Sequence, residues 1–231
     1  MGYAPLGTSV KLGTGRTLGA PEFPFEFHLV LKEPHTDATI EILSNDVTSL
    51  SYSFVREGGC GSLDAELKRD LRSYGLVGVN DILEFWMVPD KGKTRVREWL
   101  GYLEPINPSL ASRSLRIHGR GLSDWLGRIV VPQKTYNSTP VHEIVIDILD
   151  NYVVKKSKIK RTASMGLVQS VGITATTVTF NSSALEAITT LGVIGGNAVW
   201  GVRAKDGEFY FQSRTSNADH FLAEGVLQTP G

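Results

Sequence analysis

The stretch Leu83–Leu126 constrains the fold more than any other part of the chain. It opens with an extended segment, Leu83–Val88, and a polar Pro-Asp-Lys-Gly-Lys break separates this from a second one, TRVREWLGYLE, which ends at Pro105. A third extended segment, Ser112–His118, passes through a Gly-Arg-Gly sequence into a short helical pattern at Leu122–Leu126. A hairpin, a return strand and a corner helix are typical of the edge of a small antiparallel β-barrel.

Strict alternation of apolar and polar residues continues this pattern upstream. In the segment TSLSYSFVR, the side chains of Leu50, Tyr52 and Phe54 fall on one face, and this period of two indicates a half-buried strand. The strands predicted before Leu83 are Phe25–Lys32, Ala38–Leu43, Thr48–Arg56 and Ser62–Lys68, with a turn at Gly58–Gly61 between the last two. Strands in such close succession indicate a barrel or sandwich.

Helical periodicity begins in the second half of the chain. Thr139-Pro140 predicts a helix start, because a hydroxyl N-cap precedes proline at the first helical position. A single apolar stripe then runs from Val141 to Tyr152. The later predicted elements are a strand at Val171–Phe180, a short helix that begins at the Ser183–Glu186 capping box and ends at Gly192, and a hairpin around Asp206-Gly207.

These elements predict a β-rich α+β protein in three parts. Residues 1–24 form an extended arm, rich in Gly, Thr and Pro, that packs on a neighbouring subunit. Residues 25–131 form an antiparallel β-barrel domain, and residues 132–231 form a second, smaller α+β unit of barrel type. Because the second unit is too small to close its own sheet, we expect it to pack on the first, or the native chain to continue past Gly231.

The balance of charges gives no indication of a protein that binds strongly charged partners. The 24 Lys and Arg residues equal the 24 Asp and Glu residues, so nothing electrostatic demands nucleic acid or an anionic membrane as a tight ligand. The one basic run, Val154–Arg161, is predicted to be a solvated linker, with contact to a polyanion as the alternative. No apolar segment predicts a secretory signal or a stable membrane insertion.

Residue types that carry catalysis or bind metals form no recognisable motif. Cys60 lies between glycines with no identifiable base, which argues against a nucleophile. Glu143 and Asp147 lie one helical turn apart, and we expect both to be exposed on the polar face of their helix. The histidines, none of which has the spacing of a metal site, are His28, His35, His118, His142 and His220. The sequence therefore predicts no catalytic, cofactor-binding or metal-binding residue.

Several segments, taken in order, match those of one family. They are SLSYSFVREGGCGSLDAEL, the strand Ile82–Val88, the return strand Trp99–Pro105, the strand and corner helix Leu115–Leu126, the helix Val141–Tyr152, and LEAITTLGVIGGNAVWGVRAKDGEFYFQSR. Across roughly residues 25–215, their order and spacing resemble the N-terminal, tube-like region of bacteriophage baseplate hub and tail-tip proteins.

This resemblance implies a structural, non-enzymatic role in the virion, without a cofactor. Members of the family form homotrimeric rings in which each subunit supplies two tube-like barrels, so that six barrels match a hexameric tail tube. It implies a hub that adapts this symmetry to a three-fold tip and encloses the path of the genomic DNA. Distal tail and tail-tube proteins would lie above it, and tip, fibre or spike proteins below, after assembly in the host cytoplasm.

A carbohydrate- or receptor-binding β-module of a phage tail is the alternative hypothesis. Its sugar platform would use tryptophan side chains, although each lies in an apolar pattern that favours packing in a core or interface. The tryptophans are Trp86, Trp99, Trp125 and Trp200. A hydrolase that uses Glu143 and Asp147 is a third hypothesis.

Overall fold

The computed structural model describes residues 26–68, 78–88, 94–105 and 114–214. The predicted N-terminal arm, residues 1–24, lies outside the described residues, as does His220. The described residues fall into two compact units. The first extends to Asp124 and also includes Val202–Gly207, and the second contains Trp125–Gly201 and the residues from Glu208 onward.

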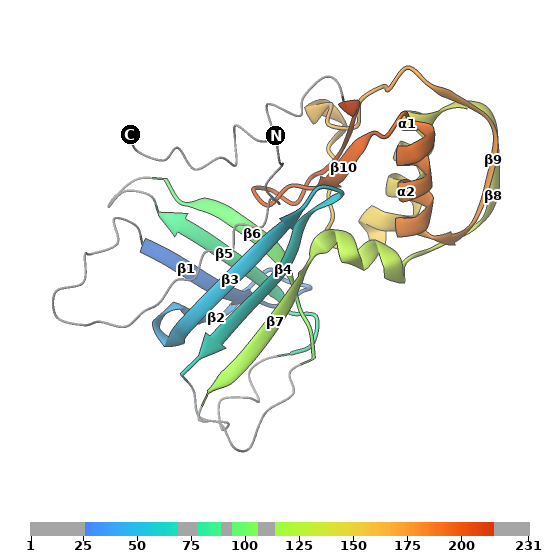
Figure 1. Cartoon of the computed structure of the whole chain (residues 1–231). Helices are drawn as coiled ribbons and strands as arrows, with labels where there is room; N and C mark the ends of the chain where they lie inside the picture. The colour runs from blue at the N-terminus through green and yellow to red at the C-terminus, as the bar shows by residue number, and fades with distance from the viewer. Residues whose placement is uncertain (1–25, 69–77, 89–93, 106–113, 215–231) are drawn as a thin grey trace, which may run out of the picture. The chain divides into compact units, whose positions relative to one another are not determined.

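The first unit is built from seven strands that pair in the order β2-β1-β5-β6-β7-β4-β3, and every neighbouring pair is antiparallel (Figure 1). The elements are β1 (Glu26–Lys32), β2 (Thr39–Ile42), the 3-10 turn η1 (Ser44–Asp46), β3 (Val47–Val55), β4 (Gly58–Leu67), β5 (Ile82–Val88), β6 (Val96–Leu103), β7 (Leu115–Gly121) and the first residues of the 3-10 helix η3 (Leu122–Arg128), whose residues from Trp125 onward belong to the second unit. With the two helices of the second unit, these strands confirm the predicted β-rich α+β class.

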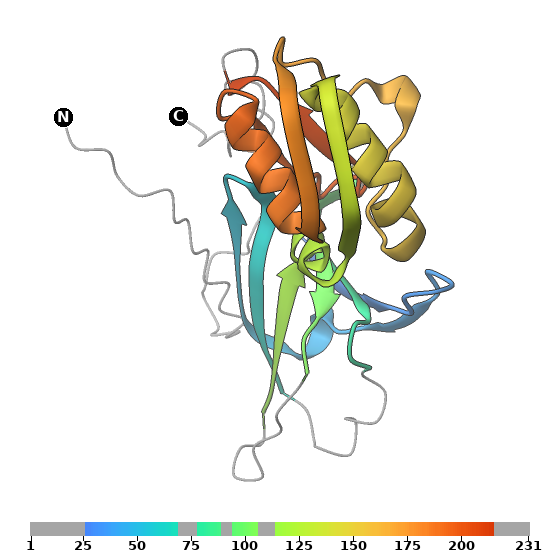
Figure 2. The same cartoon turned by 90° about the vertical axis from the view of Figure 1, so that its right-hand side faces the viewer.

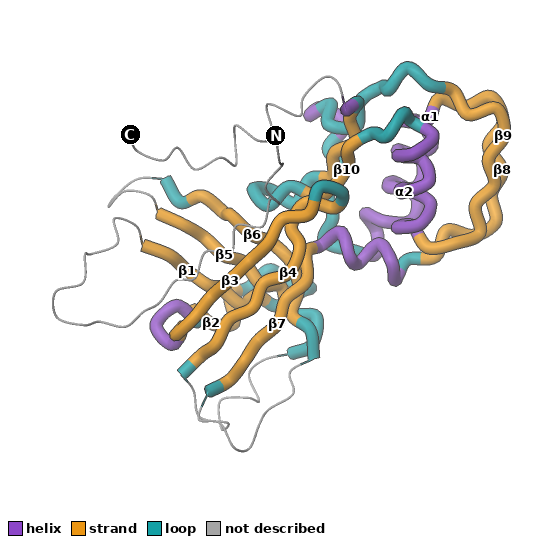
Figure 3. The backbone as a smooth tube through the Cα atoms, in the orientation of Figure 1, coloured by secondary structure: helices purple, strands orange, loops and turns teal. Residues whose placement is uncertain are grey.

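This sheet folds over on itself to make its own core. Strands β6 and β7 pair only over Gly101–Leu103 and Gly119–Gly121, and beyond that corner the two halves of the sheet diverge. In Figure 3, β3, β4 and β7 cross β1, β5 and β6 at an angle. The rings of Tyr52 on β3 and Phe85 on β5 lie 5.2 Å apart between centroids, so the two layers pack directly against each other.

Glycines at the corner allow the backbones to approach more closely than any side chain would permit. A Cβ atom on Gly101 would lie 2.0 Å from the carbonyl oxygen of Arg120, and one on Gly121 would lie 1.8 Å from that of Cys60. The ring of Trp99 fills the space beside Gly101 and is fully buried. The corner therefore requires glycine on the strands and a large flat side chain next to them.

Period-two alternation supplies the rest of this core. The buried members from β4 are Leu63, Ala65 and Leu67, and similar sets come from β1, β5 and β7. The Phe54 ring packs edge-on against that of Tyr52, with centroids 5.7 Å apart, so the two share a face of β3 as predicted, although the Phe54 side chain is 53% exposed. The pairing of β3 with β4 shifts register between Tyr52 and Phe54, close to the end of β3 at Val55.

The turn that was predicted at Gly58–Gly61 lies earlier in the chain than expected. Strand β4 begins at Gly58, and the turn lies before it at residues 56 and 57. Gly58 and Gly59 have φ angles of 118° and 89°, a backbone region that side-chain-bearing residues rarely adopt. A Cβ on Gly59 would also lie 2.4 Å from the carbonyl oxygen of Val202. These glycines therefore allow the backbone conformation at the start of β4 and the close approach of the Val202 backbone.

The second unit is a two-stranded antiparallel ribbon with helices on one of its faces (Figure 2). Its elements are β8 (Val130–Pro140), α1 (Val141–Ile148), the π-helical turn η4 (Leu149–Val153), the 3-10 turns η5 (Val154–Lys156) and η6 (Ala163–Met165), β9 (Thr174–Ser183), α2 (Ala184–Ile194), β10 (Val199–Val202) and β11 (Phe209–Gln212). The sequence did not predict β8 as a strand, because Pro132 and a run of polar residues obscure its alternation.

Helix α1 begins later than Thr139-Pro140 predicts. Thr139 and Pro140 belong to β8, where they pair with Ala175 and Thr174 of β9. The Thr139 hydroxyl donates to the Asn137 carbonyl instead of capping the helix. Pairing with a distant strand therefore overrides the local helix-start signal.

Two other local signals of this half, the cap of α2 and the last hairpin, are confirmed, although α2 continues to Ile194, past its predicted end at Gly192. The Ser183 hydroxyl accepts a hydrogen bond from the Glu186 backbone N–H at 3.2 Å and caps α2. Strands β10 and β11 are neighbours joined through a turn at Gly207, whose φ is 79°. The core of the unit forms where both helices pack on the ribbon, with the rings of Tyr136 and Phe180 6.3 Å apart on its inner face.

We expect Gly101→Ala to destabilise the protein by about 3 kcal/mol, because the new methyl group cannot fit against the Arg120 carbonyl. Urea unfolding followed by tryptophan fluorescence measures this change. Gly127→Ala is the control: its Cβ would meet only Leu185 at 3.7 Å, so the change should stay within about 0.5 kcal/mol. Equal unfolding midpoints for the two variants would refute the role of the corner.

Candidate assembly surfaces

The outward face of β7 carries a ladder of paired charges. Arg116, His118 and Arg120 alternate along the strand, so their side chains share one face. His118 places Nδ1 3.0 Å from a carboxylate oxygen of Asp64 and Nε2 3.4 Å from one of Glu104. Arg120 donates from Nε to Glu104 at 2.5 Å, and Arg116 lies 3.4 Å from Asp64. These pairs tie β7 to its neighbours on both sides.

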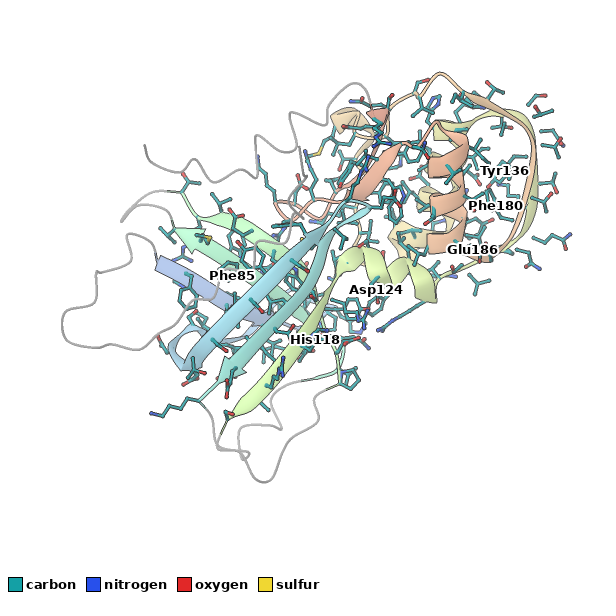
Figure 4. All side chains as sticks on the ribbon, in the orientation of Figure 1. Phe85, His118, Asp124, Tyr136, Phe180 and Glu186 are labelled. Atoms are coloured by element: carbon teal, nitrogen blue, oxygen red, sulfur yellow. The ribbon has the colours of Figure 1, made fainter. Side chains whose placement is uncertain are left out.

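Asp124 extends this ladder at the start of η3, and Figure 4 labels it together with His118. It accepts a hydrogen bond from the Tyr102 hydroxyl and lies 3.9 Å from Arg120. The ladder contains Asp64, Glu104, Arg116, His118, Arg120 and Asp124. Since its opposite charges are matched locally, we assign it a structural role rather than ligand binding.

A second charged group is buried on β5. Glu84 accepts from the Trp86 indole N–H at 2.9 Å and pairs with Lys32 at 2.9 Å and Arg97 at 2.5 Å. Arg97 also donates from Nε to the Ala204 carbonyl at 2.6 Å, and its guanidinium lies 5.3 Å from the Trp86 ring centroid. Two cations and an indole satisfy this buried carboxylate, which would otherwise be costly. Trp86 is thus held in a structural cluster.

The tryptophans do not form the platform that a sugar-binding module would use. Trp99 is fully buried and Trp200 is 3% exposed, so neither can stack on a ligand. Trp200 instead stacks on Phe209 with ring centroids 6.2 Å apart, and Trp125 lies under the Arg128 guanidinium. Their sequence context favours core packing, and the structure agrees.

The paired carboxylates of α1 have different environments. Glu143 is exposed, as predicted, but the prediction that Asp147 is exposed was wrong. Asp147 accepts hydrogen bonds from Lys134 at 2.7 Å, the Tyr136 hydroxyl at 2.5 Å and Asn151 at 2.9 Å. Burial raises the pKa of Asp147, but the bonds from Lys134 and Tyr136 outweigh burial and hold that pKa below its ordinary value. Asp147 therefore ties α1 to β8.

The described residues give little support for a cysteine nucleophile or for a metal site. Cys60 is buried, and that burial raises the pKa of its thiol to about 12, which disfavours the reactive thiolate. Among the described residues, no group of three or more His, Cys, Asp or Glu side chains is placed to hold a metal ion. No helix within the described ranges is long and apolar enough to cross a membrane.

Exposed apolar side chains lie on the two end strands of the first unit's sheet. Ile40 and Ile42 lie on β2, where Ile42 is 54% exposed, and Phe54 and Val55 lie at the end of β3. The pairings of the described residues give each of these strands one neighbour, β1 for β2 and β4 for β3. An edge strand with apolar side chains is a typical site for association with another chain.

These features define a β-rich α+β protein with matched internal charges and apolar groups on its sheet edges. No protein-family model matches the sequence, and no curated protein matches it. Solved structures do match: the chain is similar to the 43 kDa tail protein of prophage MuSo2 from Shewanella oneidensis, with a TM-score of 0.55 and 12% identity over 80% of this chain and 54% of that one.

Two further solved structures resemble the chain less closely. A tail protein from Neisseria meningitidis MC58 is 14% identical over 80% of this chain and 50% of that one, with a TM-score of 0.49. A Francisella PdpA–VgrG complex is 9% identical over 90% of this chain and 30% of that one, with a TM-score of 0.47. The chain shares the fold of the Shewanella prophage tail protein, in agreement with the resemblance of its sequence, and it spans about half the length of each of the two tail proteins.

We expect Asp147→Asn to lower the free energy of unfolding at pH 7 by about 1–2 kcal/mol, because it removes the charge that Lys134 and Tyr136 stabilise. The lowered pKa means that this stability is present above the unfolded-state pKa, about 3.9, and is lost as pH falls through the folded-state value. Urea unfolding at pH 7 and at lower pH measures the difference.

Glu143→Gln on the same helix is the matched control and should change stability by less than about 0.5 kcal/mol at either pH. A loss for Asp147→Asn that does not shrink on acidification would contradict the electrostatic explanation.

Proposed function

We propose that this chain is a structural, non-enzymatic subunit of a bacteriophage tail tip or baseplate. The observation that carries the proposal is the shared fold with the Shewanella prophage tail protein across 80% of the chain. More specifically, we propose that three copies of the chain form a hub ring that adapts a hexameric tail tube to a three-fold tip. The ring encloses the path of the genomic DNA.

The proposed ring has two tube-like domains per subunit. In this ring, residues 25–131 supply the first tube-like domain, whose end strands pair with neighbouring copies, and residues 132–231 supply the second. Distal tail and tail-tube proteins dock above the ring, and tip, fibre or spike proteins dock below. Such a component is assembled in the host cytoplasm and resides in the virion.

The sheet edges support association with further copies of this chain. Phe54 is a large apolar side chain that is half exposed at the end of an edge strand, and Ile42 is similarly exposed on β2. Burying such groups against another copy removes apolar surface from water and gives the unpaired strand backbone a partner. Zero formal net charge also suits a conduit, because a strongly basic lining would retain phosphates.

The environments of the tryptophans argue against the alternative hypothesis of a carbohydrate-binding module. Its platform needs exposed tryptophans, whereas Trp99 and Trp200 are buried and Trp86 is held by Glu84 and Arg97. We therefore retain the assembly role as the proposal.

Native mass spectrometry and light scattering test this proposal. We expect particles of three 25.2 kDa chains under mild conditions. Phe54→Asp should weaken self-association at least about tenfold, because it places a charge where an aromatic side chain is buried between copies. Val193→Asp, at an exposed apolar position on α2, is the control that should leave the trimer intact. A wild-type chain that stays monomeric at high concentration would overturn the ring.

A further inference from the structure

The basic segment Val154–Arg161 is an ordered part of the second unit, which contradicts its prediction as a solvated linker. Ile159 is 1% exposed and anchors the middle of the segment. The Ser157 hydroxyl donates to the Val153 carbonyl at 2.9 Å and accepts from the Ile159 N–H at 3.2 Å. The Phe209 N–H donates to the Lys160 carbonyl at 2.8 Å. The backbone that carries these cations is therefore held in place.

The carboxylates beside the segment are already occupied. Arg161 binds both oxygens of Asp150, each at 2.5 Å. Glu208 is buried and accepts from the backbone N–H of Thr162 at 2.8 Å and from its hydroxyl at 2.6 Å. Both acidic groups thus have partners other than lysine.

Three lysines of the segment keep their charge uncompensated. Lys155, Lys156 and Lys160 are exposed, and none has an ion pair with any residue that the structure describes. In a chain whose total formal charge is zero, five basic residues within the seven positions 155–161 are a strong local concentration. We call Lys155, Lys156 and Lys160 the lysine ridge.

The composition of the ridge favours phosphate as its ligand. Lysine presents a strongly hydrated point charge on a flexible stem, which suits phosphate contact without geometric selectivity. Protein interfaces are depleted of lysine and enriched in arginine and aromatic residues, so an acidic protein partner fits less well. Tyr152, the nearest aromatic residue in sequence, is half-buried, which disfavours base stacking as the mode of binding. A membrane-binding segment would need large apolar side chains to insert.

We propose that the lysine ridge contacts the phosphate backbone of double-stranded DNA independently of sequence. This inference deepens the proposed function and rests on it for the presence of DNA beside the chain. About three phosphate contacts give weak binding that depends steeply on salt, and binding of this kind lets the DNA slide. The ridge would therefore guide DNA without holding it.

Fluorescence anisotropy with two labelled 20-bp duplexes of unrelated sequence tests the ridge on the full chain. Three contacts predict that affinity falls about 40-fold between 50 and 200 mM salt, equally for both duplexes. The triple variant Lys155→Gln/Lys156→Gln/Lys160→Gln should lose at least about tenfold in affinity at low salt and nearly all of its salt dependence. Circular dichroism checks that each variant is folded.

Arg56→Gln/Lys68→Gln/Lys205→Gln is the matched control, since it removes three exposed cations from the first unit. It should bind DNA as the wild type does. Equal losses in both triple variants, absence of DNA binding at low salt, or tighter binding to poly-glutamate or to anionic phosphatidylserine vesicles would each overturn the proposal.

The oligomeric state separates this proposal from the assembly role. Trimers that do not bind DNA would refute the ridge and leave the hub proposal standing. Monomers that bind DNA through the ridge would refute the hub and leave the phosphate site.

Discussion

The first unit depends on the close approach of three backbones at one corner of its sheet. Gly101 and Gly121 lie so near the carbonyls of Arg120 and Cys60 that no side chain fits between them. This approach lets β6 pass to β7 while the sheet turns, and the Trp99 ring fills the volume that the glycines leave. The enclosed core, including the contact between Tyr52 and Phe85, exists only because the sheet turns here.

Many of the charged side chains lie beside a partner of opposite charge. Glu84 is buried with two cations, the β7 ladder pairs its own members, and Asp147 is held by Lys134 and Tyr136. These groups stabilise the fold because desolvated charges are costly without partners. Against this background, the exposed lysines of residues 155–160 stand out as charges that the fold itself does not use.

The exposed apolar side chains of the sheet edges support the proposed assembly role. Its large buried aromatic residues are committed to the cores, whereas Ile42 and Phe54 are exposed on the end strands of a sheet. Exposed apolar edges are a liability for an isolated protein, and assembly into a larger particle removes it.

Several elements could be predicted from local patterns in the sequence. Period-two alternation was enough for β4 from Ser62 onward, the Ser183 hydroxyl and Glu186 marked the start of α2, and Asp206-Gly207 marked the last hairpin. Each signal depends on residues within a few positions of one another, so backbone geometry alone makes it readable.

Features that join distant parts of the chain depend on contacts that no local pattern predicts. Thr139 and Pro140 end a strand because β9 pairs with them, and Asp147 is held because Lys134 and Tyr136 reach it from β8. The segment after α1 is ordered because Phe209 and Glu208, far along the chain, bind its backbone. The physical reason is the same throughout: free energy from contacts between remote residues exceeds local propensity, and one sequence read in order does not reveal which remote residues will meet.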